Sequence, residues 1–126
     1  MSFRDEVNAY CATLPGAEVS DPWGGGHDAW KVGGKLFAVI GAAGAAVAVK
    51  CASVDEAEHL KDLFGWRKAA YFHRSWVEVP LGTEADLLRH RLEASHATIL
   101  AGLPRKVRTA LEAGRNPSAP PVPGQA

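Results

Sequence analysis

The sequence predicts an α+β fold in two layers, in which a five-stranded antiparallel sheet carries helices on one face. Short runs of alternating apolar and polar residues, separated by glycine turns, predict the strands. Segments with helical spacing of apolar residues lie before, between and after these runs. No strand–helix–strand alternation of the kind that builds a parallel sheet is present. The predicted order is therefore one helix, three strands, a second helix, two strands and closing helices.

An amphipathic helix is predicted at the start of the chain. Its apolar side chains recur at i, i+4, i+7, i+8 and i+11, which places them on one helix face: Phe3, Val7, Tyr10, Cys11 and Leu14. The helix is expected to begin near Ser2 and to end at Pro15-Gly16. This apolar face is predicted to belong to the core.

Three strands are predicted next, at Asp28 to Val32, Lys35 to Ile40 and Ala45 to Cys51. Gly33-Gly34 between the first two is typical of a type I′ hairpin turn, which requires a positive φ at both central residues. In the third strand, alternation places Ala46, Ala48 and Lys50 on the side opposite Val47, Val49 and Cys51.

The second half of the chain contains another helix, two strands and closing helices. Ser53 with Glu56 forms a capping-box pattern that opens a helix ending at Gly65. A strand within Tyr71 to Leu81 is expected to pair with Ala69 to Phe72. Gly82-Thr83 is then expected to cap a long helix that runs to about Gly102, and Pro104 suits the first turn of a short final helix. Residues 1–113 are interpreted as one domain and residues 114–126 as a disordered, proline-rich tail.

Composition excludes several classes of protein. The chain has 126 residues, of which 47% are hydrophobic and 22% charged, as in ordinary globular domains. No apolar stretch approaches the ~20 residues of a membrane span, and the N-terminus does not resemble a signal peptide. Fourteen basic and fourteen acidic residues give zero net charge, while Cys11 and Cys51 lie far apart and are expected to be reduced thiols. We therefore expect a cytoplasmic protein with no membrane partner.

Motifs for catalysis or cofactor binding are weak. Gly24-Gly25-Gly26 leads into an apparent strand instead of the helix that a phosphate loop requires, so a flexible turn is expected there. His90 and His96 are six residues apart, which is not the spacing of a helical metal site. No serine or cysteine lies in a recognisable nucleophile motif. We expect no metal, no cofactor and no catalytic residue, and hence no enzyme.

The most informative stretch runs from Gly65 to Trp76. It combines three cations, one histidine and four aromatic residues without any acidic residue, a composition typical of a hairpin that faces nucleic acid. The alternative is that the rings belong to the core and the cations only solvate the turn. On the first hypothesis, the candidate DNA-binding residues are Lys31, Lys50, Arg67, Lys68, Arg74 and Trp76.

Taken together, the motifs resemble those of the MmcQ/YjbR family of small bacterial proteins. The matching pieces are Leu14-Pro15-Gly16-Ala17-Glu18, Asp21-Pro22-Trp23-Gly24, Lys31 to Ala38, Tyr71 to Leu81 and Leu103-Pro104-Arg105-Lys106. Many family members carry a histidine immediately before the hairpin tryptophan and have a longer turn, whereas this chain has Ser75 and a shorter turn.

The resemblance implies a fold like that of secretion chaperones, with the order α-β3-α-β2-α, and a "double wing" role in DNA binding. A non-enzymatic DNA-binding module with little sequence preference is the first hypothesis. The second is a protein-interaction or chaperone-like module, whose partner or second copy would meet an exposed sheet face around Ala46, Ala48 and Trp76. The third is an enzyme or small-ligand binder.

Overall fold

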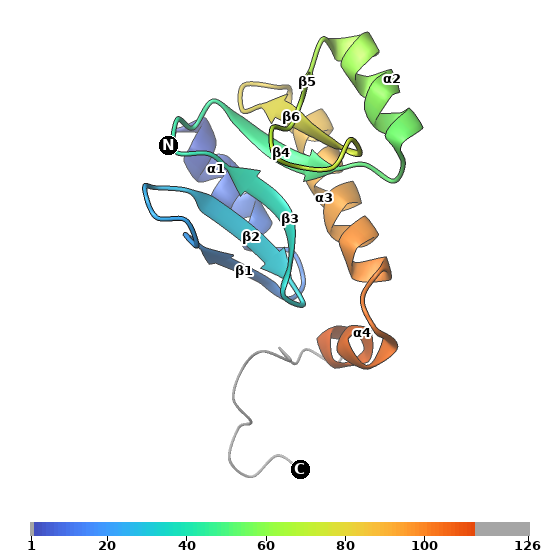
Figure 1. Ribbon diagram of the computed structural model, residues 1–126. Helices are drawn as coiled ribbons and strands as arrows, with labels where there is room; N and C mark the ends of the chain where they lie inside the picture. Colours follow the sequence, from blue (N-terminus) through green and yellow to red (C-terminus); the bar gives the residue numbers. More distant parts are fainter. Residues whose placement is uncertain (1, 113–126) are drawn as a thin grey trace.

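Within residues 2–112, which the computed structural model describes, six strands form one antiparallel sheet with the order β1-β2-β3-β4-β6-β5 (Figure 1). Helices α1 and α3 lie behind this sheet in the view of Figure 1. The elements are α1 (Phe3–Cys11), β1 (Ala17–Ser20), β2 (Asp28–Val32), β3 (Lys35–Ile40), β4 (Ala46–Lys50), α2 (Val54–Phe64), β5 (Arg67–Lys68), β6 (Trp76–Pro80), α3 (Ala85–Ala101) and α4 (Arg105–Glu112). The predicted tail at residues 114–126 lies outside the described residues.

The sheet has six strands, so the prediction of five was wrong. The missed strand is β1, which pairs with β2 at one edge of the sheet, and its residues Glu18 to Ser20 are exposed. Because an exposed edge strand needs no buried face, it lacks the apolar alternation that identified the other strands.

The predicted strands β2, β3 and β4 and their tight turn are confirmed within a residue at each end. Gly33 and Gly34 have φ values of 57° and 81°, as a type I′ turn requires. The register of β2 against β3 shifts between Trp30 and Lys31, so Phe37 has no direct partner in β2.

The strand predicted at Ala69–Phe72 was wrong, because the ladder of β5 with β6 contains only Arg67 and Lys68. After Lys68 the chain turns, with the Phe72 amide donating to the Ala69 carbonyl, and Tyr71 adopts a φ of 69°. This positive φ is incompatible with a continuing strand. Residues 69–75 therefore leave the sheet edge, and we call them the covering turn.

Helix ends also differ in detail from the prediction. Helix α1 ends at Cys11 rather than at Pro15-Gly16, and α3 takes Glu84 as its N-cap rather than Thr83. Ser53 does cap α2, and its Oγ accepts from the Glu56 amide. The Glu56 carboxylate, however, accepts a hydrogen bond from Arg91 of α3 at 3.0 Å, so it ties α2 to α3.

The main core joins the helices to one face of the sheet. Its buried side chains include Val7 of α1, Leu60 of α2 and Leu92 of α3, which share one cluster with Phe37 and Ile40 of β3. None of the helices within residues 2–112 is both long and apolar enough to cross a membrane.

Ser95 of α3 makes a polar connection between the two layers. Its Oγ donates to the carbonyl of Phe37 at 2.6 Å and accepts from the amide of Lys50 at 2.9 Å. Phe37 has no partner in β2 because of the register shift, and both Phe37 and Lys50 lie just beyond the last residue pair between β3 and β4. A fully buried serine thus satisfies backbone groups that would otherwise be unpaired, and it fixes the backbone position of Lys50.

We predict that Gly33→Ala destabilises the protein more than Gly34→Ala. Both alanines must adopt a positive φ, which costs about 1–2 kcal/mol of folding stability. Only at Gly33 does the added Cβ meet a neighbour, Leu103 Cδ1 at 2.5 Å, whereas nothing lies within 4 Å at Gly34. Overpacking should add a further ~1–3 kcal/mol at Gly33. Urea unfolding of both variants measures the difference, and equal losses would contradict this packing.

The protein should also lose stability above pH 9 through Cys11. Burial raises the pKa of this thiol from 9.0 to about 12, so the unfolded chain releases the proton at a lower pH than the folded protein. The free energy of unfolding should therefore fall by about 1.4 kcal/mol between pH 8 and pH 10 on account of this group. Urea unfolding at the two pH values should show a smaller fall for Cys11→Ala than for the wild type. The same fall in both would refute this assignment.

Candidate functional site on the outer sheet face

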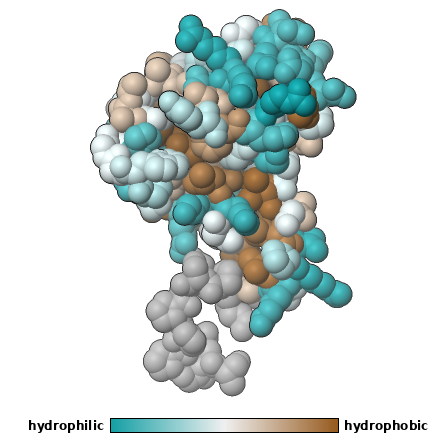
Figure 2. All heavy atoms as spheres, viewed as in Figure 1, coloured by the Kyte–Doolittle hydropathy of each residue, from teal (hydrophilic) through white to brown (hydrophobic). Residues whose placement is uncertain are grey.

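The sheet face opposite the main core carries a row of small side chains. Ala29, Val39, Ala48 and Glu78 are successive partners across β2, β3, β4 and β6, and we call the face that they mark the outer face. Lys50 of β4 and Trp76 of β6 are partners further along these two strands. Figure 2 shows hydrophobic side chains gathered near the middle of the molecule in this view, with hydrophilic side chains on either side.

Trp76 lies on the outer face, as predicted, but it is not exposed. The covering turn brings Phe72 over it, with ring centroids 4.5 Å apart and the rings nearly parallel. Only 7% of Trp76 is accessible, and it packs with Ala69, Ala29 and Val39 in a second small core. The prediction of an exposed tryptophan anchor on this face was therefore wrong.

Three lysines surround one end of this second core. Lys31, Lys35 and Lys50 line a hollow of about 610 Å³ together with Phe72 and Trp76, and we call it the lysine hollow. Its other lining residues come from the β2–β3 turn, from β3 and from the C-terminal end of α3 and the residues that follow, and none is acidic. Lys31, Lys50 and Trp76 were predicted as site residues. Lys35 and Phe72 were not.

A hydrogen-bond network orients Lys50. Its Nζ donates to Ser75 Oγ at 2.6 Å, and that oxygen lies 2.9 Å from His73 Nδ1. Serine, histidine and lysine at these distances resemble a nucleophile with two bases, which the sequence analysis did not detect. Ser75 is only 3% exposed and does not line the hollow, however. The network therefore positions Lys50, whose ammonium keeps two further N–H donors.

The remaining predicted cations lie elsewhere. Arg67 and Lys68 are exposed on the edge strand β5, and Arg74 is exposed in the covering turn. None of these three lines the lysine hollow. Within residues 2–112, no ion pair involves any of the five predicted cations. The structure thus divides the six predicted residues into a group of three at the hollow and a group of three nearer the β5 edge.

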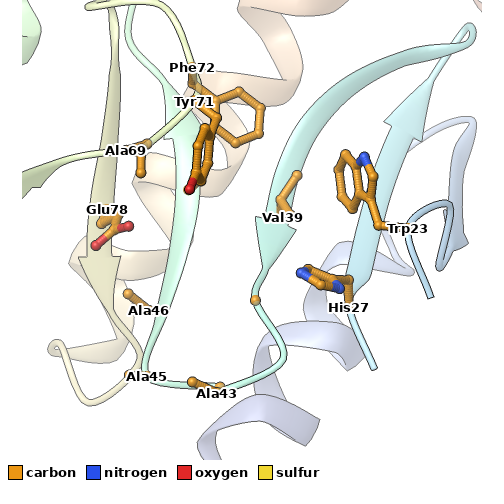
Figure 3. Close-up of a pocket in the computed structure, with 14 residues that line it drawn as sticks. Trp23, His27, Val39, Ala43, Ala45, Ala46, Ala69, Tyr71, Phe72 and Glu78 are labelled. Carbon is orange, nitrogen blue, oxygen red and sulfur yellow. The ribbon is translucent and has the colours of Figure 1, made fainter. Parts of the chain in front are cut away.

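A second depression on the outer face includes Ala46 and Ala48, which the sequence analysis placed on an exposed face that could meet a partner. It has a volume of about 810 Å³ and we call it the aromatic groove (Figure 3). Val39, Ala46 and Ala48 contribute small apolar side chains, and Trp23 and Tyr71 lie at different sides of it. Trp23 is 56% exposed and Tyr71 is fully exposed, so these rings have little packing of their own. The sequence analysis did not assign Trp23 or Tyr71 to this face, although Tyr71 belongs to the basic and aromatic stretch.

The loop that carries Trp23 is held by its own carboxylate. Asp21 accepts hydrogen bonds from the amides of Gly26 at 3.0 Å and His27 at 3.2 Å. These amides are the donors that a phosphate would need, so the glycine run does not serve as a phosphate loop. His27 in turn makes an edge-to-face contact with Trp23. This loop therefore presents Trp23 to the groove.

Arg4 of α1 connects the loops at this end of the groove. Its guanidinium donates to the carbonyls of Gly26 at 2.6 Å and Gly41 at 2.9 Å and to the carboxylate of Asp28 at 2.8 Å. Burial alone would raise the pKa of Asp28, but hydrogen bonds from Asn8 and Arg4 and the charge of Arg4 hold it below its ordinary value. The Asp28 carboxylate is therefore ionised at neutral pH and keeps its ion pair with Arg4.

No group of three metal-ligating side chains is found in the part of the chain that the structure describes.

We predict that Trp76→Ala lowers the free energy of unfolding by about 3–5 kcal/mol, because the indole fills the second small core. Tyr71→Ala should change it by no more than about 0.5 kcal/mol, because the phenol ring contributes little buried area. Urea unfolding of both variants is the measurement. A Trp76→Ala variant as stable as the wild type would show that Phe72 does not pack on Trp76 in solution.

Comparison with known proteins agrees with the geometry described above. The chain matches the crystal structure of Deinococcus radiodurans protein DR2400, with family-model domain DUF419, at a TM-score of 0.73 and 20% sequence identity over 86% of each chain. This match supports the fold. None of the curated proteins matches the sequence. The YjbR family model matches residues 12–98, which include the entire sheet and most of α3. The chain therefore belongs to the YjbR family.

Proposed function

We propose that this protein binds nucleic acid with little sequence preference, through the cations of the lysine hollow and of the neighbouring sheet edge. The observation that carries the proposal is the lysine hollow. Lys31, Lys35 and Lys50 line it together with two stacked aromatic rings, and no acidic residue lines the hollow. Three lysines that line one hollow favour a ligand with several negative charges, such as a phosphate backbone. Glu18 lies opposite Lys31 in the sheet but does not line the hollow.

Lysine contacts to phosphate explain why little sequence preference is expected. Phosphates are the same at every nucleotide, so contacts to them position a nucleic acid without reading its bases. Arg67, Lys68 and Arg74 are exposed and add cations at the neighbouring sheet edge. Because the whole chain has zero net charge, its long-range attraction for nucleic acid is weak, and we expect salt-sensitive binding.

The proposal involves no chemical step. Among residues 2–112, Ser75 Oγ is the serine oxygen that contacts both a histidine and a lysine, and Ser75 is only 3% exposed. Cys11 and Cys51 are free and buried, which fits the proposed cytoplasmic location of a nucleic-acid-binding protein.

A protein-interaction module is the second candidate function. The aromatic groove favours it, because exposed tryptophan and tyrosine side chains are common anchors at protein interfaces. The anchors would then be Trp23 and Tyr71, since Trp76 is buried.

We predict that Lys31→Ala/Lys35→Ala weakens binding of nucleic acid of any sequence and reduces its salt dependence. Loss of two phosphate contacts should lower the slope of log K against log salt by about 1.4 for a single strand or about 1.8 for a duplex. Fluorescence anisotropy with labelled oligonucleotides between about 50 and 200 mM salt measures both quantities. Lys61→Ala is the matched control, because Lys61 lies on α2 and pairs with Glu58.

Two outcomes would contradict the proposal. Wild-type protein that binds neither single-stranded nor duplex DNA at about 50 mM salt would exclude nucleic acid as its ligand and favour the protein-interaction module. Unchanged binding by Lys31→Ala/Lys35→Ala would show that the lysine hollow is not the binding site. In that case a variant with Arg67, Lys68 and Arg74 replaced by alanine tests the second cationic group.

A further inference from the structure

Two solvent-exposed aromatic rings face one groove on the outer face. Trp23 comes from the loop before β2 and Tyr71 from the covering turn, so segments far apart in sequence supply them (Figure 3). Tyr71 reaches this position only with a positive φ of 69°, a conformation that residues with bulky side chains rarely adopt. Backbone strain of this kind is characteristic of residues whose position matters for binding.

The groove can receive a flat, apolar group. Small residues such as Ala46, Ala48 and Val39 line it, so that a ring could approach the sheet closely. Its volume of about 810 Å³ falls within the usual range of ligand pockets. Arg4 and Asp21 hold the loops at one end in place. The site is thus preformed, and ordering it costs little when a ligand binds.

The groove adjoins the lysine hollow. Phe72 lines both depressions, with the aromatic groove on one side and the three lysines on the other. A ligand that spans Phe72 must therefore carry flat apolar groups beside a row of negative charges. Single-stranded nucleic acid has this composition, since each base is attached to a phosphate backbone.

We propose that the protein binds nucleic acid as a single strand, with bases stacked on Tyr71 and Trp23 in the aromatic groove and the phosphate backbone along the lysine hollow. This inference rests on the proposed function and specifies its ligand. In a duplex the flat faces of the bases are covered by their neighbours, and only a single strand exposes them for stacking on protein rings.

Glu78 supports this orientation of the strand. It lines the aromatic groove and is half-buried, so its negative charge disfavours a phosphate there. The lysine hollow has no acidic lining residue. Arg67 is the direct partner of Glu78 in the sheet but does not line the groove. The charges that line the two depressions therefore favour the backbone on the lysine side and leave the groove to the uncharged bases.

The test compares a labelled single-stranded oligothymidylate with a duplex of equal length at about 50 mM salt, by fluorescence anisotropy. The wild type should bind the single strand more tightly. Tyr71→Ala and Trp23→Ala should each weaken single-strand binding by about 5- to 150-fold, the usual range for loss of one stacked base, and leave duplex binding unchanged. Tyr71→Phe keeps the ring and should bind like the wild type.

Leu63→Ala is the matched control, because Leu63 is 61% exposed on α2 and lies outside the groove. Circular dichroism melting of each variant verifies folding. Equal affinity for single strand and duplex, or single-strand binding unaffected by Tyr71→Ala and Trp23→Ala, would overturn the inference. If binding still depended on Lys31 and Lys35 in that case, the proposed function would stand without it. Absence of binding to both probes would refute both proposals.

Discussion

The stacking of Phe72 on Trp76 determines what the outer face of the sheet presents to solvent. A tryptophan in the middle of an uncovered sheet would make that face a continuous apolar patch. Instead the covering turn buries the indole and lies between two depressions of different chemistry, one lined by lysines and one by small apolar residues and exposed rings. The same turn places Ser75 and His73 beside Lys50 and raises Tyr71 to the rim of the groove.

Contacts from the helical layer make this outer face rigid. Ser95 of α3 hydrogen-bonds to the backbone of Lys50 and Phe37 in the sheet. Arg4 of α1 hydrogen-bonds to the carbonyls of Gly26 and Gly41. Ser95 bonds to the backbone just beyond the last residue pair between β3 and β4, and Arg4 bonds to the carbonyls of two loops. The helices therefore do more than close the core, because they also fix the loops and the lysine from which the candidate site is built.

The sequence predicted most of the fold because local signals there agree with tertiary structure. The Gly33-Gly34 turn and the alternation in β4 depend only on neighbouring residues, and both are confirmed. Strand β1 escaped prediction because an exposed edge has no apolar pattern. The covering turn escaped it because the apolar residues of 69–72 suit a strand, and a tyrosine gives no local signal of the positive φ that Tyr71 adopts. The lysine hollow was predicted in part, since Lys31, Lys50 and Trp76 were candidates. Ala46 and Ala48 of the groove were also placed on an exposed face. The parts played by Lys35, Trp23 and Tyr71 depend on how distant segments meet in the folded sheet.

The central claim is that nucleic acid lies across the outer face, and an NMR titration of nitrogen-labelled protein with a single-stranded oligonucleotide at about 50 mM salt tests it most directly. The indole N–H signal of Trp23 and the amide signals of Lys31 and Lys50 should shift. The indole of Trp30, which donates to Asn8 in the core at 2.8 Å, should remain unchanged and serves as an internal reference. Unchanged signals throughout, or shifts confined to α2 and the exposed surface of α3, would contradict this account.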